Sequence, residues 1–273
     1  MNFKLGFWAD REYHLDKMNL SQLVVAYFQY YAIASYLFVA FILSLYVIFS
    51  YSYNGASIFE LSISVFSTIT IYPLVWYVLH RWVLHSKWMW KSKITAPIWK
   101  RIHFDHHADP NNLKVLFGAL YTTLPTVIVA TVPIGFYFGG FPGAAASLCT
   151  GIITTCFYEF IHCIEHLGYM PKSRWLRELK KLHMAHHFHN ETGNFGITNF
   201  LCDWIFGTIY KKNNEKPRSE TVFNLGYNEN IALKYPYVAE LTPEWPYVAD
   251  PVRRQKMREE EQNGNLVNTL PNF

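Results

Sequence analysis

Four long stretches of this chain consist almost entirely of hydrophobic side chains. They cover residues 27–51, 58–79, 115–138 and 143–161. The only charged residues inside them are Glu60, near the start of the second stretch, and Glu159, near the end of the fourth. Because a helix of about 20 mostly apolar residues crosses a bilayer, this pattern favours an all-α integral membrane protein with four transmembrane helices over a soluble protein with four buried helices.

The basic residues indicate how these helices are oriented. All 24 lysines and arginines lie before the first stretch, between the second and the third, or after His162, and the turns at 52–57 and 139–142 contain none. Segments rich in Lys and Arg tend to stay in the cytoplasm. We therefore expect a multi-pass protein with two membrane hairpins and both termini in the cytoplasm, in the endoplasmic reticulum or a bacterial inner membrane.

The hairpins divide the chain into three parts. Residues 1–20 form a polar N-terminal lead without the apolar segment of a signal peptide, 21–210 form a membrane domain, and 211–273 form an irregular cytoplasmic tail. A charge run at 253–261 predicts one short helix in this tail. We interpret the tail as solvated, with covering the rest of the cytoplasmic part or binding a partner as the alternatives. Residues 87–101 mix Lys and Arg with Trp, which suits either a membrane-interface segment or a solvated loop.

Composition narrows the possible partners. The chain is 51% hydrophobic and 16% charged, and its formal net charge is +4. This charge fits a face resting on anionic lipid headgroups and gives no reason to expect a nucleic-acid partner. The four cysteines form no CxxC pair, so we expect free thiols in a reducing compartment.

The distribution of histidine points to chemistry. Eleven of the twelve histidines fall in four clusters: HX4H at 80–85, HX2HH at 103–107, HX3H at 162–166, and HX2HH at 183–187 with His189 close behind. All four clusters lie on the predicted cytoplasmic side. Neutral imidazole is a common metal ligand, and ionisable groups near the membrane core are costly unless they are paired or functional. The clusters therefore predict a site for more than one metal ion.

Helical spacing brings most of these histidines together. Residues three and four apart share a helix face, so the histidines within each of the last three clusters should project together. His80 and His85 lie roughly 140° apart on an ideal helix, so they face different metals or the helix is distorted there. The candidate ligands are His80, His85, His103, His106, His107, His162, His166, His183, His186 and His187. His189 is a further candidate, as a ligand or beside one, and His14 is expected at the surface.

Four acidic residues are candidates to orient these ligands. A metal-bound histidine usually donates its outer N–H to a carboxylate or a carbonyl. Glu159 precedes His162 by three residues and lies on the same helical side. Asp203 and Asp105 follow as candidates, and then Glu165.

The donor set limits the metal. Imidazole suits zinc, copper, iron and nickel, but structural zinc sites commonly include cysteine, and these clusters have no obvious cysteine partner. A nitrogen-rich two-metal site beside a bilayer could suit iron and the activation of O₂ toward a C–H bond. A metal transporter would need ligands along a path through the membrane, so the gathering of all clusters on one face argues against that alternative.

At these residues the chain resembles the fatty acid hydroxylase superfamily of membrane di-iron enzymes, and looks closest to the fatty acid 2-hydroxylases. The order of histidine spacings is similar to the histidine boxes of that family, and the segments 109–117 and 195–208 resemble its approach to the third membrane helix and its closing segment. The resemblance runs from Leu74 to Tyr210. It implies four transmembrane helices capped by a cytosolic helical lobe that holds a dinuclear metal site, with the ten histidines as ligands.

The resemblance also implies an activity. It implies two iron ions, for which zinc can substitute in purified protein, and hydroxylation of a long acyl chain of a fatty acid, sphingolipid or other lipid with O₂ and two electrons. A site at the membrane surface lies near the head group, which favours C2. Many fatty acid 2-hydroxylases carry a cytochrome b5 domain, which the short polar lead lacks, so we expect a separate cytochrome b5-like or ferredoxin-like donor. Sterol oxidases or desaturases and carotenoid hydroxylases of the same superfamily remain alternatives.

Overall fold

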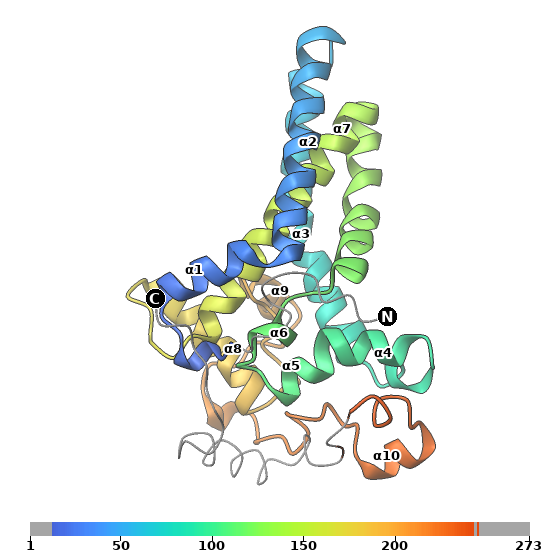
Figure 1. Ribbon diagram of the computed structural model, residues 1–273. Coiled ribbons are helices and arrows are strands. Elements are labelled where there is room, and N and C mark those ends of the chain that lie inside the picture. The colour runs from blue at the N-terminus through green and yellow to red at the C-terminus, as the bar shows by residue number, and fades with distance from the viewer. Residues whose placement is uncertain (1–12, 243–244, 246–273) are drawn as a thin grey trace.

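The computed structural model describes residues 13–242 and Trp245. The secondary-structure elements in these residues are helices. Figure 1 shows long helices standing on a lobe of shorter ones. Within the described residues, three helical segments are long and apolar enough to cross a membrane: Tyr31–Tyr53, Ile58–Leu84 and Leu113–His166.

The first hydrophobic stretch forms two helices rather than one. The helix α1 (Leu20–Gln29) begins after Asn19, whose side chain accepts a hydrogen bond from the N–H of Gln22. Tyr30 then adopts extended backbone angles (φ −71°, ψ 126°), and α2 (Tyr31–Tyr53) continues in a new direction (Figure 1). The first membrane-length helix therefore begins at residue 31 instead of 27.

The third and fourth stretches belong to one kinked element, α7 (Leu120–His166). Its helix is interrupted at Gly139 and at Gly140, where φ is +56°, a value that glycine adopts without a side-chain clash. The two arms then pack closely, because a Cβ atom on Gly135 would lie only 2.2 Å from the carbonyl oxygen of Gly143. Residues at the predicted start of the third stretch instead form the separate short helix α6 (Leu113–Leu116).

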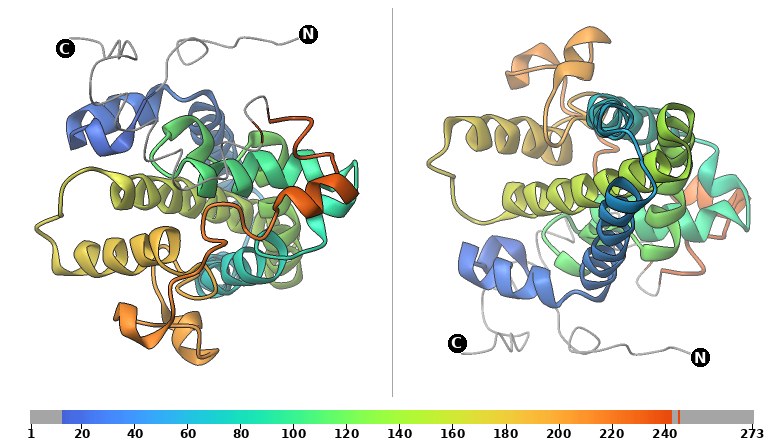
Figure 2. Two further views of the ribbon diagram at one scale, coloured as in Figure 1. Left: turned by 90° about the horizontal axis from the view of Figure 1, so that it is seen from below. Right: turned by 90° about the horizontal axis from the view of Figure 1, so that it is seen from above.

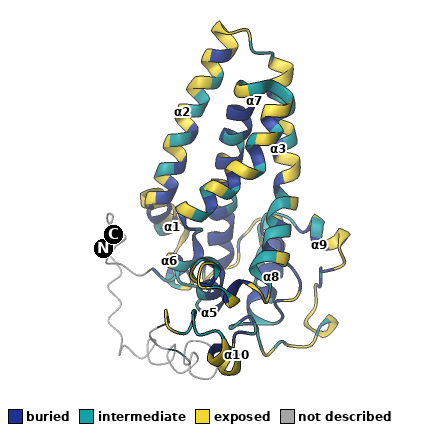
Figure 3. Cartoon of the chain, turned by 90° about the vertical axis from the view of Figure 1, so that its right-hand side faces the viewer, coloured by how far each residue is buried: buried dark blue, intermediate teal, exposed yellow. Residues whose placement is uncertain are grey.

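Small residues line the contacts between the long helices. The helix α3 (Ile58–Val78) packs against α7, as does α2. The hydroxyl of Ser147 on α7 donates to the carbonyl of Ser64 on α3 (3.1 Å), and both residues are fully buried. Small side chains let membrane helices approach closely. The outer faces of the bundle carry exposed residues, among them large apolar ones such as Phe38 (Figure 3).

The lobe consists of short elements. They are η1 (Leu15–Lys17), the π-helical η2 (Leu79–Leu84) that continues α3, η3 (Met89–Lys91), α4 (Thr95–Trp99), the π-helical η4 (Lys100–Phe104), α5 (Asp105–Ala108), α8 (Arg174–Phe188), α9 (Leu201–Ile205), η5 (Asn213–Glu215) and α10 (Glu229–Lys234). The helix α8 runs beside the end of α7 (Figure 2). This pair carries five of the ten predicted ligands.

The segment after α9 covers the lobe. It contributes to a second hydrophobic core, whose buried members are Met89, Trp90, Ala96, Trp99, Phe104, Ala108, Leu225, Tyr227, Ala232 and Val238. The interpretation of a solvated tail is therefore wrong for residues 222–238, while the helix predicted at 253–261 lies outside the described residues. In the segment 87–101, Trp90 and Trp99 are buried in this core, so it is not a solvated loop, while Trp88 is half exposed.

Candidate metal centre

A distorted helix brings the first two histidines together. In η2 the N–H of His85 donates to the carbonyl of His80, five residues earlier (3.0 Å). This is the π-helical pattern, which is rare and occurs frequently at functional sites. The Nε2 atoms of His80 and His85 consequently lie 3.2 Å apart. Of the two alternatives left open by the HX4H spacing, the distorted helix is correct.

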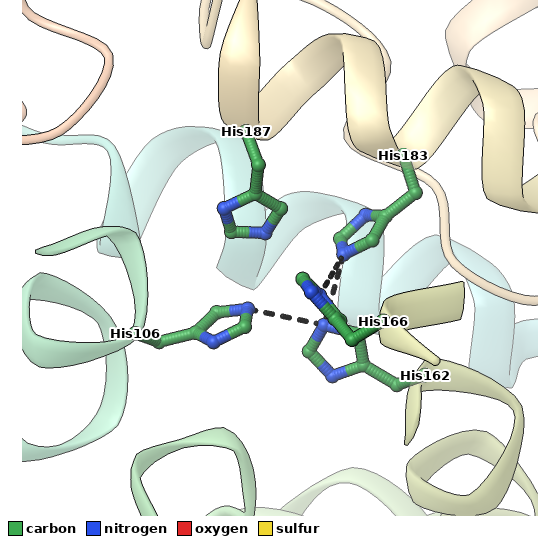
Figure 4. A group of neighbouring side chains, drawn as sticks. All are labelled: His106, His162, His166, His183 and His187. Atoms are coloured by element: carbon green, nitrogen blue, oxygen red, sulfur yellow. Dashed lines mark hydrogen bonds between the residues drawn. The ribbon is translucent and has the colours of Figure 1, made fainter. Parts of the chain in front are cut away.

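The largest group of histidines combines α5, α7 and α8. Five buried residues each offer a ring nitrogen, and these atoms all lie within 4.8 Å of one another: His106, His162, His166, His183 and His187. Their rings converge on a common centre (Figure 4). The Nε2 atom of His183 lies 3.0 Å from those of both His162 and His166. We call this set the five-histidine site.

A second group adjoins the first. Its members, which likewise offer nitrogens within 4.8 Å of one another, are His80, His85, His107 and His186. We call this set the four-histidine site. The Nε2 atom of His103 lies 2.8 Å from that of His85, but His103 falls outside the mutual distance that defines the set. The ring centroids of His107 and His187 lie 4.3 Å apart, so the two sites are adjacent.

Neighbouring histidines in the HX2HH clusters serve different sites. His106 belongs to the five-histidine site and His107 to the four-histidine site, and His187 and His186 divide in the same way. Successive residues of a helix point about 100° apart, so one HH pair can reach two adjacent centres. The prediction that each cluster projects together is confirmed for His162 and His166, which share one group, whereas each HX2HH cluster divides between the two groups.

Backbone carbonyls fix three of the imidazoles. The Nδ1 atoms of His80, His107 and His186 lie 2.6, 2.8 and 2.7 Å from the carbonyl oxygens of Phe195, Val222 and Gly193. A carbonyl only accepts, so each Nδ1 carries the proton and each Nε2 keeps its lone pair for a metal. Sequence reasoning missed these partners, because a carbonyl group is present at every residue and leaves no signal in the pattern of residue types.

Asp203 holds one of these carbonyls in place. Its carboxylate is fully buried and accepts hydrogen bonds from the N–H groups of Phe195 and Gly196 (2.8 Å each) and from the hydroxyl of Thr208 (2.7 Å). The predicted contact between Asp203 and a histidine is therefore replaced by an indirect one. Asp203 orders the loop, and the loop carbonyl orients His80.

The donor set fits metal ions. In a site with metal–nitrogen distances of about 2.0–2.1 Å, ligand atoms at right angles lie about 2.9 Å apart, close to the 2.8–3.2 Å separations found here. Burial and then the neighbouring imidazoles lower the pKa of His106, His183 and His187 well below 6.5, so these rings are neutral donors at pH 7. Both ring nitrogens of His187 are buried without a hydrogen-bond partner among the described residues.

A model of the fatty acid hydroxylase family matches residues 65–208, which include all ten histidines. The chain belongs to the fatty acid hydroxylase family.

Among related proteins, the chain is 31% identical over 179 residues to the dihydroceramide fatty acyl 2-hydroxylase FAH1 of Arabidopsis thaliana, and the match covers 61% of this chain and 68% of that protein. It is 28% identical over 147 residues to the ceramide very long chain fatty acid hydroxylase SCS7 of Saccharomyces cerevisiae, covering 51% of this chain and 36% of SCS7. The aligned region thus spans about a third of SCS7.

The family's fold is also shared with a solved structure. "Full length scs7p (only hydroxylase domain visible)" superimposes with a TM-score of 0.56 and 24% identity, covering 71% of this chain and 69% of that one. This likeness shows the common helical architecture.

The remaining predicted site residues lie outside both histidine groups. The ring Nε2 of His189 lies 2.9 Å from the carbonyl oxygens of Asn213 and Lys216, and Asp105 forms an ion pair with Lys100 (2.8 Å). The carboxylate of Glu159 accepts from the N–H of Gly118 (3.1 Å). His14 forms an isolated backbone bridge with Asn112.

The protein contains a cavity of about 380 Å³ between the bundle and the lobe. One part of its wall is formed by histidines from both groups and by His103: His80, His103, His106, His162, His183 and His187. Most of the remaining wall is apolar or aromatic, including Trp76, Leu116, Tyr121 and Tyr158. Ligand cavities of about 300–1,000 Å³ with an apolar lining and a few converging polar groups are typical of small-molecule sites.

Proposed function

We propose that this protein is a membrane di-iron monooxygenase that hydroxylates a long acyl chain of a fatty acid, sphingolipid or other lipid at C2. The observation that carries the proposal is the apolar cavity whose wall includes histidines of both metal sites. The relatives named as fatty acyl 2-hydroxylases support C2 as the position. The reaction converts R–CH2–CO–X, O₂, two electrons and two protons into R–CH(OH)–CO–X and water.

The ten histidines would hold the two metal ions in this proposal. His106, His162, His166, His183 and His187 would bind one ion, and His80, His85, His107 and His186 the other, with His103 as the tenth ligand beside His85. Bound iron would supply the activation of O₂, and zinc could substitute for it in purified protein. The residues of the chain orient the imidazoles through backbone carbonyls, receive the acyl chain, and exclude water from the cavity.

The proposed membrane arrangement has four crossings. The helices α2 and α3 form two crossings and one hairpin. The two arms of α7, on either side of Gly139–Gly140, form the other two crossings and the second hairpin. The absence of Lys and Arg from the turns at 52–57 and 139–142 supports an exoplasmic location for those turns. The termini and metal sites would then be cytoplasmic, in the endoplasmic reticulum or a bacterial inner membrane, with residues 21–210 as the membrane domain.

Substrate would enter from the bilayer and electrons from the cytoplasm. Tyr121, at the start of α7, lines the cavity and is 64% exposed, so the cavity reaches the outer surface where the third crossing begins. A lipid chain could enter there without leaving the membrane. A separate cytochrome b5-like or ferredoxin-like protein would deliver two electrons to the cytoplasmic lobe.

The test is lipid analysis of cells that express the chain under ¹⁸O₂. We expect new 2-hydroxyacyl lipids that carry one ¹⁸O atom. The His187→Ala variant removes a donor of the five-histidine site and should make at least about 100-fold less of this product. The His14→Ala control should make as much product as the wild type. Labelled sterols or carotenoids, or equal product from the His187→Ala variant, would contradict the proposal.

A further inference from the structure

Glu165 carries a buried carboxylate that accepts no hydrogen bond from the described residues. It lies on α7 between His162 and His166, and its side chain is fully buried. Neither carboxylate oxygen has a hydrogen-bond partner among the described residues. Burying an unpaired polar or charged group is costly, and native proteins usually provide it with a partner. We therefore expect the Glu165 carboxylate to interact with a group bound among the histidines.

The carboxylate faces the metal-binding side of the histidines. Its Oε2 atom lies 4.0 Å from Nε2 of His183, the same nitrogen that lies 3.0 Å from Nε2 of His162 and of His166. A carboxylate that merely orients a ligand accepts from the outer nitrogen of the imidazole. Here the oxygen lies beside the inner, convergent nitrogens, where a cation would sit.

The nearby lysine is engaged elsewhere. The ammonium group of Lys180, on α8, donates to the carbonyls of Leu167 and Tyr169 (the latter at 3.0 Å), in the loop that follows α7. Among the described residues, no Lys or Arg nitrogen is within 4.0 Å of Glu165, and the nearest charge-capable group is the neutral ring of His183. Lys180 thus closes the loop and leaves the carboxylate facing the histidines.

We propose that Glu165 supplies a carboxylate ligand to the metal ion of the five-histidine site. This inference rests on the metal binding in the proposed function, not on its substrate. The two ions would then have different surroundings: imidazoles with one carboxylate at the first, imidazoles alone at the second. An anionic oxygen donor lowers the net charge of the first centre by one and suits harder metal ions than imidazole alone.

The experiment measures metal retention in the purified full-length protein. The wild type and each variant are loaded with Fe(II) alone under anaerobic conditions, challenged with a chelator for increasing times, and analysed for metal ions per chain. We expect Glu165→Gln to lose one of two ions about 10–100-fold faster than the wild type, and Glu165→Asp to lie between them. Glu178→Gln, an exposed change on α8, serves as the matched control and should retain both ions.

A second measurement separates ligation from a structural role. X-ray absorption at the iron edge should change in Glu165→Gln and remain unchanged in Glu178→Gln. Glu165→Leu should also lose one ion even where its thermal midpoint is equal to or above that of the wild type. Retention of both ions at the wild-type rate by Glu165→Leu would overturn the proposal. So would equal thermal destabilisation by Glu165→Gln and Lys180→Met with metal retention unchanged, because Glu165 would then be the charge partner of Lys180.

These measurements use no lipid and no turnover. If the chain fails to make 2-hydroxyacyl lipids but Glu165→Gln loses one ion, the ligand assignment stands and the proposed function falls. If it makes those lipids and Glu165→Gln keeps both ions at the wild-type rate, the ligand assignment falls and the proposed function stands.

Discussion

At the scale of single residues, the geometry of the site depends on the histidines and also on the groups that orient their rings. Three imidazoles donate from Nδ1 to backbone carbonyls, and one of these carbonyls, that of Phe195, belongs to a loop that Asp203 fixes through two N–H groups. The residue types of the ligands could be predicted from the sequence. The loop that orients His80 could not, because its contribution is a carbonyl.

Asp203→Asn tests this indirect contact. An amide side chain offers one acceptor oxygen and directs its NH2 group toward a backbone N–H, so at least one buried donor loses its partner, at a cost of about 1–3 kcal/mol. We expect a thermal midpoint several degrees lower and about 10-fold weaker metal binding at the four-histidine site. Thermal unfolding in detergent and metal titration provide the measurements.

Asp105→Asn is the matched control for this variant. It breaks a partly exposed ion pair with Lys100, a contact that contributes about 1 kcal/mol or less, and it should leave metal binding unchanged. The interpretation of Asp203 would be wrong if both variants behaved alike in both measurements.

At the scale of elements, the sequence predicts helices well and their interruptions poorly. The hydrophobic stretches locate α2, α3 and the two arms of α7 to within a few residues. The break at Tyr30 has no signal in hydrophobicity, because both sides of it are apolar. The HX4H spacing did indicate the π-helix η2, since two residues five positions apart do not lie on the same face of a regular α-helix.

Gly135→Ala tests the close contact between the arms of α7. The added Cβ atom would lie 2.2 Å from the carbonyl oxygen of Gly143 and 2.5 Å from the hydroxyl of Ser147, so the arms must move apart. Such overpacking costs about 1–3 kcal/mol, and we expect a lower thermal midpoint and a lower yield of folded protein. Gly139→Ala is the control, because its Cβ would meet its nearest neighbour at 3.4 Å. Equal midpoints for the two variants would contradict the argument.

At the scale of the whole molecule, bundle and lobe meet at the cavity. Its wall takes Trp76 from α3, Tyr158 from α7 and histidines such as His106 and His183 from the lobe, so neither half forms the cavity alone. The sequence predicts that all four clusters lie on one side of the helices, and the structure brings histidines of all four together. The sequence could not predict the cavity, whose shape depends on how side chains distant in the chain pack.

Trp76→Ala tests how this cavity limits the substrate. The indole lines the cavity, stacks on Tyr158 (5.2 Å between ring centroids), and also lines a small pocket between α3 and α7 with Thr126 and Ala130. Removing it should join the two spaces and shift the hydroxylated products toward longer acyl chains, as lipid mass spectrometry would reveal. Trp88→Ala, at a half-exposed position, is the control. An unchanged chain-length distribution in Trp76→Ala would rule out this role.

The carbonyl of Val222 that orients His107 has a consequence for biosynthesis. A ribosome makes the membrane helices first and releases residue 222 only after every histidine ligand has emerged. The long apolar helices are therefore complete while the four-histidine site still lacks one of its orienting partners. Binding of a metal ion at that site should then follow synthesis of residue 222.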